Sequence, residues 1–312
     1  MTDLSQVAVL GAGVIGASWA ALFLASGRSV TVFDPSETAA AEVRAYVDRA
    51  WPAMEALGLT EQGDRTALRF AGSAAQAVEG AGFVQENVPE RLPIKHAVYA
   101  EIEPCLAHGA VVASSASGLM LGQMQAGWRD PAPLVLGHPF NPPHLIPLVE
   151  VMGNARTGEG IVARAEAFYE SCGKVTIRVQ REVPGHVANR LQAAVWREAI
   201  HLAQTGVASV GDIDKAMWAG PGLRWAAMGP TTLFGLGAGA GGLAAFCDHF
   251  SDTFNGWWAD LGEPELTPEL AEMLIAGLDE ATGGRSVEEQ SARRDAMIVA
   301  MQQALAKLRA AD

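Results

Sequence analysis

Short apolar runs alternate with stretches of helical spacing over residues 1–183. Between the runs, apolar positions recur at helical spacing, most clearly over 36–58, 91–107 and 158–172. The apolar runs predict buried strands at 7–10, 29–33, 68–71, 81–86, 109–114, 133–137, 148–152 and 174–179. Strands that alternate with helices predict an α/β domain with a doubly wound, mostly parallel sheet.

From residue 184 onward the strand signals disappear, and the pattern predicts an all-α second domain over 184–312. Helical spacing covers 187–203, and Ser209 is a predicted N-cap because Asp212 follows it three residues later. Glycine and proline over 220–230 predict a turn-rich loop, and a polar helix is predicted over 286–310. The tryptophans of this half are expected either in its core or at an interface between two copies: Trp196, Trp218, Trp225, Trp257 and Trp258.

Composition narrows the class of protein. The chain has 312 residues, of which 49% are apolar and 18% charged, as is typical of a globular enzyme. Its net charge of −13 argues against nucleic acid or an anionic membrane as a general partner. Cys105, Cys172 and Cys247 are widely spaced without a C-x-x-C pair, so we expect no disulfide framework, no metal site and a cytoplasmic protein. The first strand leaves no room for a signal peptide, and no apolar run reaches membrane-spanning length.

The first predicted strand stops at Gly11, which opens a G-x-G-x-x-G motif that continues through Gly13 and Gly16. In such a motif the first glycine permits a tight turn, the second lets the backbone approach a pyrophosphate, and the third lets the helix pack on the strand. The helix N-terminus, with Val14 and Ile15, supplies N–H groups and a partial positive charge. We therefore expect the NAD pyrophosphate here.

Asp34 ends the second predicted strand, about twenty residues after the glycines. A carboxylate at this point accepts hydrogen bonds from the ribose hydroxyls and repels a 2′-phosphate. NAD is therefore favoured over NADP.

His138 follows a strand that leads to the carboxyl edge of the sheet, where ligands bind. An imidazole is suited to take the proton of an alcohol while a hydride leaves for NAD, and a carboxylate on its other nitrogen would fix the tautomer. Glu150 is placed to do so if the proline-rich segment 139–147 loops back behind His138. A structural histidine and a surface carboxylate are the alternatives. Asn141 and Ser117 are candidates to contact the reacting oxygen.

Five motifs in chain order resemble the 3-hydroxyacyl-CoA dehydrogenase family: Gly11 to Gly16 with Asp34, Ser114 to Ser117, His138-Pro-Phe-Asn-Pro, Pro147-Leu-Val-Glu150 and Pro184-Gly-His-Val-Ala-Asn-Arg190. The resemblance implies an NAD-binding Rossmann domain, a helical dimerisation domain and a homodimer. It also implies that His138 is the base and Glu150 its partner. Ser117, Asn141 and Asn189 match positions at the substrate hydroxyl and the nicotinamide. Glu86 and Arg91 match the loop beside the cofactor, and Ser114 is expected at the same edge.

Within the family, segments 138–150 and 222–230 are most similar to the λ-crystallin and L-gulonate 3-dehydrogenase branch, and L-carnitine dehydrogenases share much of the second segment. Arg224 is a candidate fork for a free substrate carboxylate, with a surface salt bridge as the alternative. The acyl-CoA members are rich in lysine after Asp34, whereas residues 36–66 here contain none, which makes a poor CoA cradle.

We therefore expect NAD-dependent oxidation of the 3-hydroxyl of a small L-3-hydroxy acid, L-gulonate first. The alternatives are L-carnitine, a short-chain 3-hydroxyacyl-CoA, or an NAD-binding crystallin-like protein without catalysis. The trimethylammonium group of carnitine would need an aromatic cage. Ser115 and Ala116 depart from the family pattern, and His186 stands at a usually apolar position, where we expect a core residue.

Overall fold

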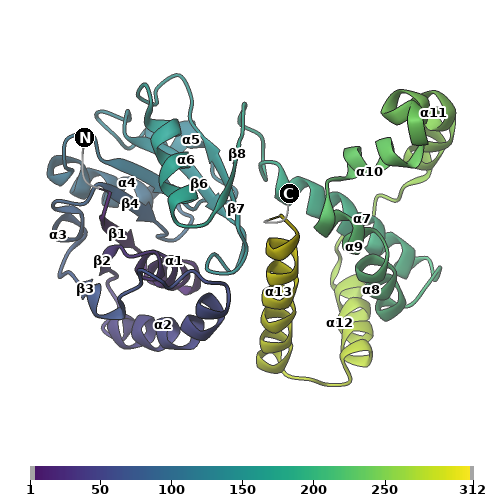
Figure 1. The fold of residues 1–312 in the computed structure, drawn as a ribbon, viewed down its shortest axis with the longest axis horizontal. Coiled ribbons are helices and arrows are strands. Elements are labelled where there is room, and N and C mark those ends of the chain that lie inside the picture. The colour runs from purple at the N-terminus through teal and green to yellow at the C-terminus, as the bar shows by residue number, and fades with distance from the viewer. Residues whose placement is uncertain (1–3, 310–312) are drawn as a thin grey trace. The chain divides into compact units, whose positions relative to one another are not determined.

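The computed structural model describes residues 4–309 and divides into two compact units (Figure 1). Unit 1 comprises Met1–Ala188 and Arg294–Asp312, and unit 2 comprises Asn189–Arg293. Within residues 4–309, none of the helices has both the length and the apolar character needed to cross a bilayer.

Unit 1 is built on an eight-stranded sheet with the order β3-β2-β1-β4-β5-β6-β7-β8. All neighbours are parallel except β6 and β7, which confirms the predicted doubly wound, mostly parallel sheet. The strand order reverses between β1 and β4, the position at which such sheets bind ligands. The strands are β1 (Gln6–Leu10), β2 (Ser29–Phe33), β3 (Leu68–Phe70), β4 (Phe83–Glu86), β5 (Val111–Ser114), β6 (Leu134–Pro139), β7 (Leu148–Met152) and β8 (Val175–Arg178).

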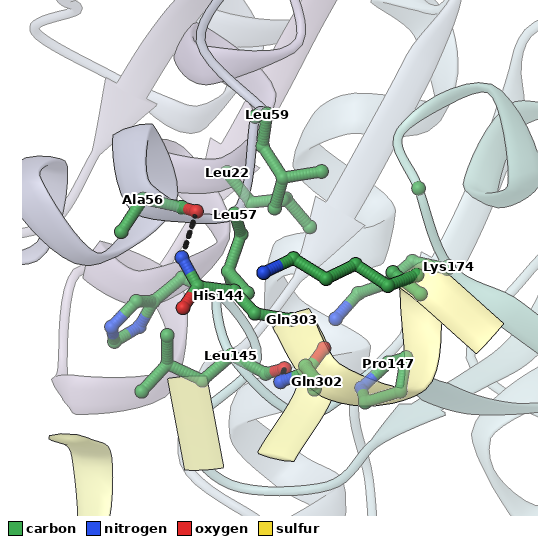
Figure 2. A pocket seen from close by; sticks show the side chains of 14 residues that line it. Leu22, Ala56, Leu57, Leu59, His144, Leu145, Pro147, Lys174, Gln302 and Gln303 are labelled. Carbon is green, nitrogen blue, oxygen red and sulfur yellow. Dashed lines mark hydrogen bonds between the residues drawn. The ribbon is translucent and has the colours of Figure 1, made fainter. Parts of the chain in front are cut away.

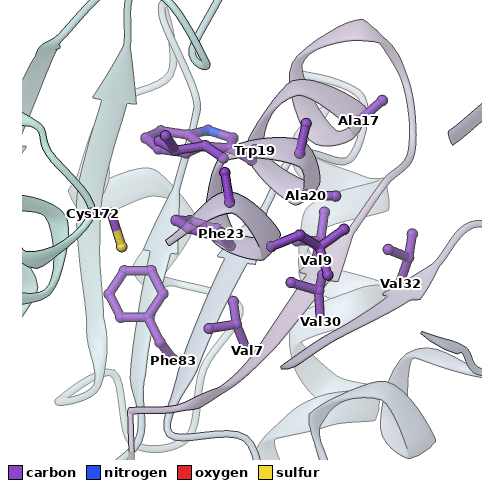
Figure 3. Packing of buried hydrophobic residues seen from close by; sticks show 14 of the residues in the cluster. Val7, Val9, Ala17, Trp19, Ala20, Phe23, Val30, Val32, Phe83 and Cys172 are labelled. Atoms are coloured by element: carbon purple, nitrogen blue, oxygen red, sulfur yellow. The ribbon is translucent and has the colours of Figure 1, made fainter. Parts of the chain in front are cut away.

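Two apolar layers cover the two faces of this sheet because successive strand residues point to opposite sides. Val7 and Val9 pack under α1 (Val14–Ala25), α2 (Ala39–Ala56) and α6 (Ile161–Ser171). Ala8 and Leu10 pack under α3 (Ala74–Val78), α4 (Leu92–Ile102) and α5 (Leu121–Gln125). Figure 3 shows the first layer, in which Trp19 and Phe23 of α1 lie above the strands, with ring centroids 5.1 Å apart.

The last helix, α13 (Val287–Arg309), belongs to unit 1 from Arg294 on. The side-chain amide of Gln302 donates to the Leu145 carbonyl oxygen at 2.7 Å, and that of Gln303 donates to the Ala56 carbonyl oxygen at 2.6 Å. The predicted helix 286–310 is confirmed, although residue 310 lies outside the described residues. The domain limits at 183 and 184 stay a prediction.

Unit 2 is all-helical, as predicted, and is formed by α7 (Ala188–Gln204), α8 (Val210–Ala219), α9 (Pro221–Ala227), α10 (Pro230–Gly237), α11 (Gly242–Asp260) and α12 (Pro268–Thr282). Ser209 caps α8, and its side chain accepts from the Asp212 N–H at 3.1 Å. The prediction of a turn-rich loop over 220–230 was wrong, because α9 occupies residues 221–227. Proline fits the first turn of a helix, where its missing N–H has no partner to lose, so Pro221 starts α9 rather than preventing it.

Candidate active site

The glycine motif forms a turn in which each of the three glycines meets a different structural requirement. Gly11 has φ +86°, and a Cβ atom there would lie 2.7 Å from the Asn87 carbonyl. A Cβ atom at Gly16 would lie 1.9 Å from the Gly11 oxygen, so the helix and the turn could not pack. A Cβ atom at Gly13 would meet nothing within 4 Å. Gly13 therefore leaves an open backbone surface beside the start of α1.

Helix α1 begins at this open surface without a capping side chain and without an acidic residue in its first turn. The N–H groups of Val14, Ile15 and Gly16 are in the first turn, where no helical carbonyl can accept from them. Uncapped N–H groups and the positive end of the helix dipole suit a pyrophosphate. The residues present thus fit the diphosphate of NAD.

Asp34 connects the end of β2 to the glycine turn. Its Oδ2 accepts from the Ala12 N–H at 2.7 Å, and its Oδ1 accepts from the Ser36 N–H at 2.9 Å. Each carboxylate oxygen can accept more than one hydrogen bond, and Asp34 is only half-buried. The carboxylate thus retains capacity for the two hydroxyls of a ribose.

Glu86 and Ser114, both predicted beside the cofactor, turn into the interior. Glu86 is fully buried, and its Oε1 accepts from Lys95 at 2.6 Å and from the Val88 N–H at 2.8 Å. Its Oε2 accepts from the hydroxyls of Tyr99 and Ser114, both at 2.7 Å. This buried network fixes the loop after β4. Burial and the Glu86 charge raise the pKa of Tyr99 well above its usual range, so Tyr99 remains a donor.

Arg91 lies at the exposed start of α4, directly after the same loop. Contacts of Glu86, Ser114 and Arg91 with a cofactor stay predictions.

Ser117 faces a carboxylate that the sequence did not single out. Its hydroxyl donates to Glu90 Oε2 at 3.0 Å, and the N–H groups of Gly118 and Leu119 donate to Oε1 at 2.5 and 2.8 Å. Partial burial favours a raised pKa for Glu90, but these three hydrogen bonds outweigh it, and the pKa is lowered. Glu90 is therefore an anion that joins the loops after β4 and β5.

The structure brings His138 and Glu150 together through strand pairing. The segment 140–147 returns the chain so that β7 runs antiparallel to β6, and the register sets His138 directly opposite Glu150. His138 Nδ1 lies 2.8 Å from Glu150 Oε2, and both side chains are buried. A carboxylate oxygen only accepts, so Nδ1 carries the hydrogen and Nε2 keeps the lone pair in the neutral ring. That is the tautomer of a general base.

The other carboxylate oxygen of Glu150 holds the start of α7. Oε1 accepts from the N–H groups of Val187 and Ala188, both at 2.9 Å. Burial favours a raised pKa for Glu150, but the His138 hydrogen bond and the two backbone donors outweigh it, and the pKa is lowered. Glu150 is therefore an anion that can stabilise an imidazolium at His138.

The remaining predicted residues lie on three separate elements. Asn141 is exposed just after β6. Asn189 is the second residue of α7, and Arg224 lies in the last turn of α9. Their roles at the substrate stay predictions.

Segment 140–147 connects β6 to β7 and is held by a buried lysine, Lys174, which the sequence analysis did not predict. The Lys174 ammonium donates to the carbonyl oxygens of Pro143 and Ile146, the second at 2.7 Å. Burial lowers the pKa of Lys174 to about 7. Lys174 lines a cavity of about 460 Å³. Figure 2 shows it there, with Gln302 and Gln303 of α13 among the residues around it.

His144, on the same segment, docks onto α1. The Ser18 hydroxyl oxygen accepts from the His144 backbone N–H at 2.9 Å, and the same hydroxyl lies 2.8 Å from the His144 Nδ1. Burial lowers the pKa of His144 to about 4, so the ring is neutral near pH 7. Ser18 and His144 are far apart in the sequence, and only the packed fold brings them together.

Models of two parts of one family match nearly the whole chain. The 3-hydroxyacyl-CoA dehydrogenase NAD binding domain matches residues 6–183, and the 3-hydroxyacyl-CoA dehydrogenase C-terminal domain matches residues 185–284. An L-carnitine dehydrogenase of Streptomyces coelicolor is 46% identical over 98% of this chain and 96% of its own. An L-carnitine dehydrogenase of Pseudomonas aeruginosa is 40% identical over 99% of this chain and 97% of its own.

A solved structure is similar over almost the whole chain. It is 5-formyl-3-hydroxy-2-methylpyridine 4-carboxylic acid 5-dehydrogenase, an NAD⁺-dependent dismutase, with a TM-score of 0.83 and 28% identity. The similarity covers 97% of this chain and 99% of that chain.

Proposed function

This chain belongs to the 3-hydroxyacyl-CoA dehydrogenase family, and we propose that it oxidises the 3-hydroxyl group of L-carnitine with NAD. It is an NAD-dependent oxidoreductase that acts on a CH–OH group. The observation that carries the proposed substrate is the 46% identity to an L-carnitine dehydrogenase over almost the whole of both chains. L-gulonate, the first expectation from the sequence motifs, has no such support and gives way to L-carnitine.

The proposed mechanism uses the His138–Glu150 pair. NAD, when bound, supplies the acceptor of the hydride that leaves the alcohol carbon. Nε2 of neutral His138 accepts the hydroxyl proton, and the Glu150 carboxylate stabilises the imidazolium through the hydrogen bond at Nδ1. Glu150 keeps the ring in one orientation because its second oxygen is fixed by two backbone donors.

Two neighbouring parts of the cofactor, the diphosphate and the adenosine ribose, are assigned to groups at the glycine turn. We infer that the first turn of α1 binds the diphosphate and that Asp34 accepts from the adenosine ribose. The Asp34→Ala variant should then lose much of its preference for NAD over NADP, because the charge that repels a 2′-phosphate is gone. An unchanged preference would contradict this role.

Residues 36–66 contain no lysine that could bind the phosphates of CoA. This favours a substrate with a free carboxylate over a CoA thioester. We infer that Arg224 pairs with this carboxylate. The Arg224→Met variant should raise the KM of L-carnitine at least tenfold, because a charge-assisted pair is lost. A normal KM would remove Arg224 from the site.

We also propose a homodimer that forms through unit 2. Within this unit, Ile200 and Leu270 are the buried large apolar residues. Helices α7, α8 and α9 line an open apolar groove of about 950 Å³, which includes Leu191, Trp196, Met217 and Trp225. A second copy of the unit would cover this surface, as the apolar faces of obligate dimers require.

The test of the proposed substrate is the rate of NADH formation with L-carnitine, D-carnitine, L-gulonate, L-3-hydroxybutyrate and L-3-hydroxybutyryl-CoA, each with NAD and with NADP. We expect turnover of L-carnitine with NAD to exceed every other combination. Higher kcat/KM with L-gulonate would return the chain to the first expectation. Higher kcat/KM with the CoA thioester would contradict the argument from the missing lysines.

A further inference from the structure

The cavity beside Lys174 lies within unit 1, apart from the residues assigned to the reaction. It has a volume of about 460 Å³ and is lined by α1, the chain after α2, segment 140–147, residues 173–174 and α13. Small-molecule sites have volumes of about 300 to 1,000 Å³. Of the described residues that line it, none belongs to the glycine turn, and His138 and Glu150 are not among them. The cavity is therefore large enough for a ligand of its own.

This cavity has a buried inner end and an exposed mouth. At the inner end, Leu22, Leu145 and Lys174 are between 1% and 6% exposed. Figure 2 shows the Lys174 side chain pointing into the cavity. The exposed lining residues of α13 form the mouth: Gln303, Ala306 and Lys307. A ligand that enters at α13 therefore meets Lys174 at the buried end.

The ionisable groups of the lining favour an anion. The chain has four lysines, and two of them, Lys174 and Lys307, line this cavity. His144 is the other ionisable residue of the described lining, in which there is no aspartate or glutamate. In a chain with a net charge of −13 this is a local exception. An anion here meets two lysines and no carboxylate.

Lys174 can bind an anion while it holds segment 140–147. An ammonium group has three hydrogens, and two of them go to the carbonyl oxygens of Pro143 and Ile146. The third is available to a carboxylate. Burial lowers the pKa of Lys174 to about 7, and Cys172 acts in the opposite direction. An anion beside the amine would raise this pKa again, so the amine should take up a proton as the anion binds.

The apolar part of the lining suits a hydrocarbon tail. It is formed mainly by four leucines and a proline: Leu22, Leu57, Leu59, Leu145 and Pro147. Each methylene group buried among such side chains raises affinity about threefold to fourfold. A polyhydroxylated acid would instead bury hydroxyl groups against apolar side chains, which is unfavourable. The lining thus combines a cationic end with an apolar wall.

We propose that this cavity is a second ligand site, which binds a carboxylate with an apolar tail and pairs the carboxylate with Lys174. The site goes beyond the proposed oxidation of L-carnitine and does not depend on it. Its lining joins four parts of unit 1, so a bound ligand should stabilise this unit against unfolding.

Calorimetry with octanoate at pH 8 tests the site, and octan-1-ol and octylammonium serve as probes with the same tail. We expect octanoate to bind most tightly and octylammonium least. In Lys174→Met the dissociation constant of octanoate should rise at least about tenfold, because a charge-assisted pair is lost. That of octan-1-ol should change less than about twofold. From butanoate to hexanoate to octanoate, the constant should fall about tenfold at each step.

Proton uptake shows whether the carboxylate pairs with Lys174 itself. Titrations in two buffers of different ionisation enthalpy should give an uptake close to one proton in the wild type at pH 8, where Lys174 is mainly neutral. Lys174→Met should take up none, because the pKa of His144, about 4, keeps that ring neutral. The matched control is Lys215→Met, at an exposed lysine of unit 2, which should change neither uptake nor affinity.

A second variant tests the cavity without changing Lys174. Ala306 is exposed on α13 and lines the mouth, so the indole of Ala306→Trp should block entry. Its octanoate dissociation constant should rise at least about tenfold while its circular dichroism matches that of the wild type. This variant keeps the test decisive if Lys174→Met does not fold.

The outcomes separate this site from the reaction. Failure of the wild type to bind octanoate, or unchanged affinity in the folded Lys174→Met and Ala306→Trp variants, would refute the site. Competition of octanoate with NAD or with L-carnitine would place octanoate at the active site and also refute it. Absence of L-carnitine turnover, with octanoate bound as expected, would overturn the proposed function alone.

Discussion

Unit 1 and unit 2 use similar apolar residues in opposite ways. In unit 1, helices on both faces of the sheet bury two continuous apolar layers. In unit 2, Trp196, Trp218, Trp257 and Trp258 are each more than half exposed, at 54 to 65%. Unit 1 therefore has a core of its own, whereas unit 2 carries these large apolar side chains outward, which is why we propose that a second copy covers them.

The chemistry is divided along the same line. The glycine turn, Asp34, His138 and Glu150 all belong to unit 1, and the contacts that orient them are internal to it. Substitutions at the His138–Glu150 pair should therefore act on catalysis, and substitutions of the exposed tryptophans of unit 2 should act first on association. This contrast can be tested from both sides.

The largest effect is expected from His138→Ala. Loss of a general base lowers kcat by about a hundredfold to ten-thousandfold. The dissociation constant of NAD should change little, because His138 is not part of the glycine turn. Rates of NADH formation and the NAD affinity measured by calorimetry check both statements. Turnover close to that of the wild type would refute the assignment of the base.

The next effect concerns the exposed face of unit 2. Replacing Trp196 by Asp puts a charge in the apolar groove of α7, α8 and α9 that we propose a second copy covers. Loss of a large aromatic contact costs on the order of 2 kcal/mol or more, so the dimer should dissociate at least about thirtyfold more readily. Sedimentation at several concentrations measures this.

The matched control is Ile94→Asp, which changes an exposed apolar residue of unit 1. It should leave the oligomeric state unchanged. A monomeric wild-type protein, or equal effects of both changes, would contradict the contrast between the units.

The sequence was sufficient where one local pattern decides the structure. Alternating apolar runs and helical spacing predicted the strands and helices of unit 1. The pairing of Glu150 with His138 depended on a return of segment 139–147, which the antiparallel register of β6 and β7 supplies. Other features depend on distant packing. Nothing near His144 in the sequence points to Ser18, and nothing near Lys174 points to the carbonyl groups of segment 140–147.

The inward position of Glu86 could have been predicted from the alternation of side chains along β4. Side chains alternate along a strand, so Glu86 shares the face of Val84, which packs in the layer under α3, α4 and α5. The alternation indicated an inward carboxylate, whereas its place at the end of the strand suggested a cofactor contact. Lys95 then neutralises it, as a fully buried carboxylate requires.

Lys174 makes the stability of unit 1 depend on pH. Burial lowers its pKa to about 7, against an ordinary value of 10.5. Above pH 7 the unfolded chain holds a proton that the folded chain has released, so stability rises with pH. The slope is on the order of 1 kcal/mol per pH unit.

Lys174→Met removes this group. The unfolding free energy of the wild type minus that of the variant should therefore increase from pH 7 to 8.5. Urea denaturation at several pH values measures it. A constant difference would mean that Lys174 is charged in the fold throughout this range.

The smallest effects give the sharpest comparison because the same substitution is possible in both units. Ser73 caps α3 in unit 1, and Ser209 caps α8 in unit 2, each by accepting from a backbone N–H at 3.1 Å. Replacing either by Ala should destabilise its own unit by about 1 kcal/mol. Hydrogen exchange measured by mass spectrometry locates the loss in α3 or in α8.

Protein concentration then separates the two units. If unit 2 is stabilised by a second copy, exchange in α8 should slow as the protein concentration rises, in the wild type and in Ser209→Ala alike. Exchange in α3 should be independent of concentration in the wild type and in Ser73→Ala, because the cover of α3 is its own sheet. Concentration-independent exchange in α8 would show that unit 2 is stable without a partner, and its exposed tryptophans would then need another explanation.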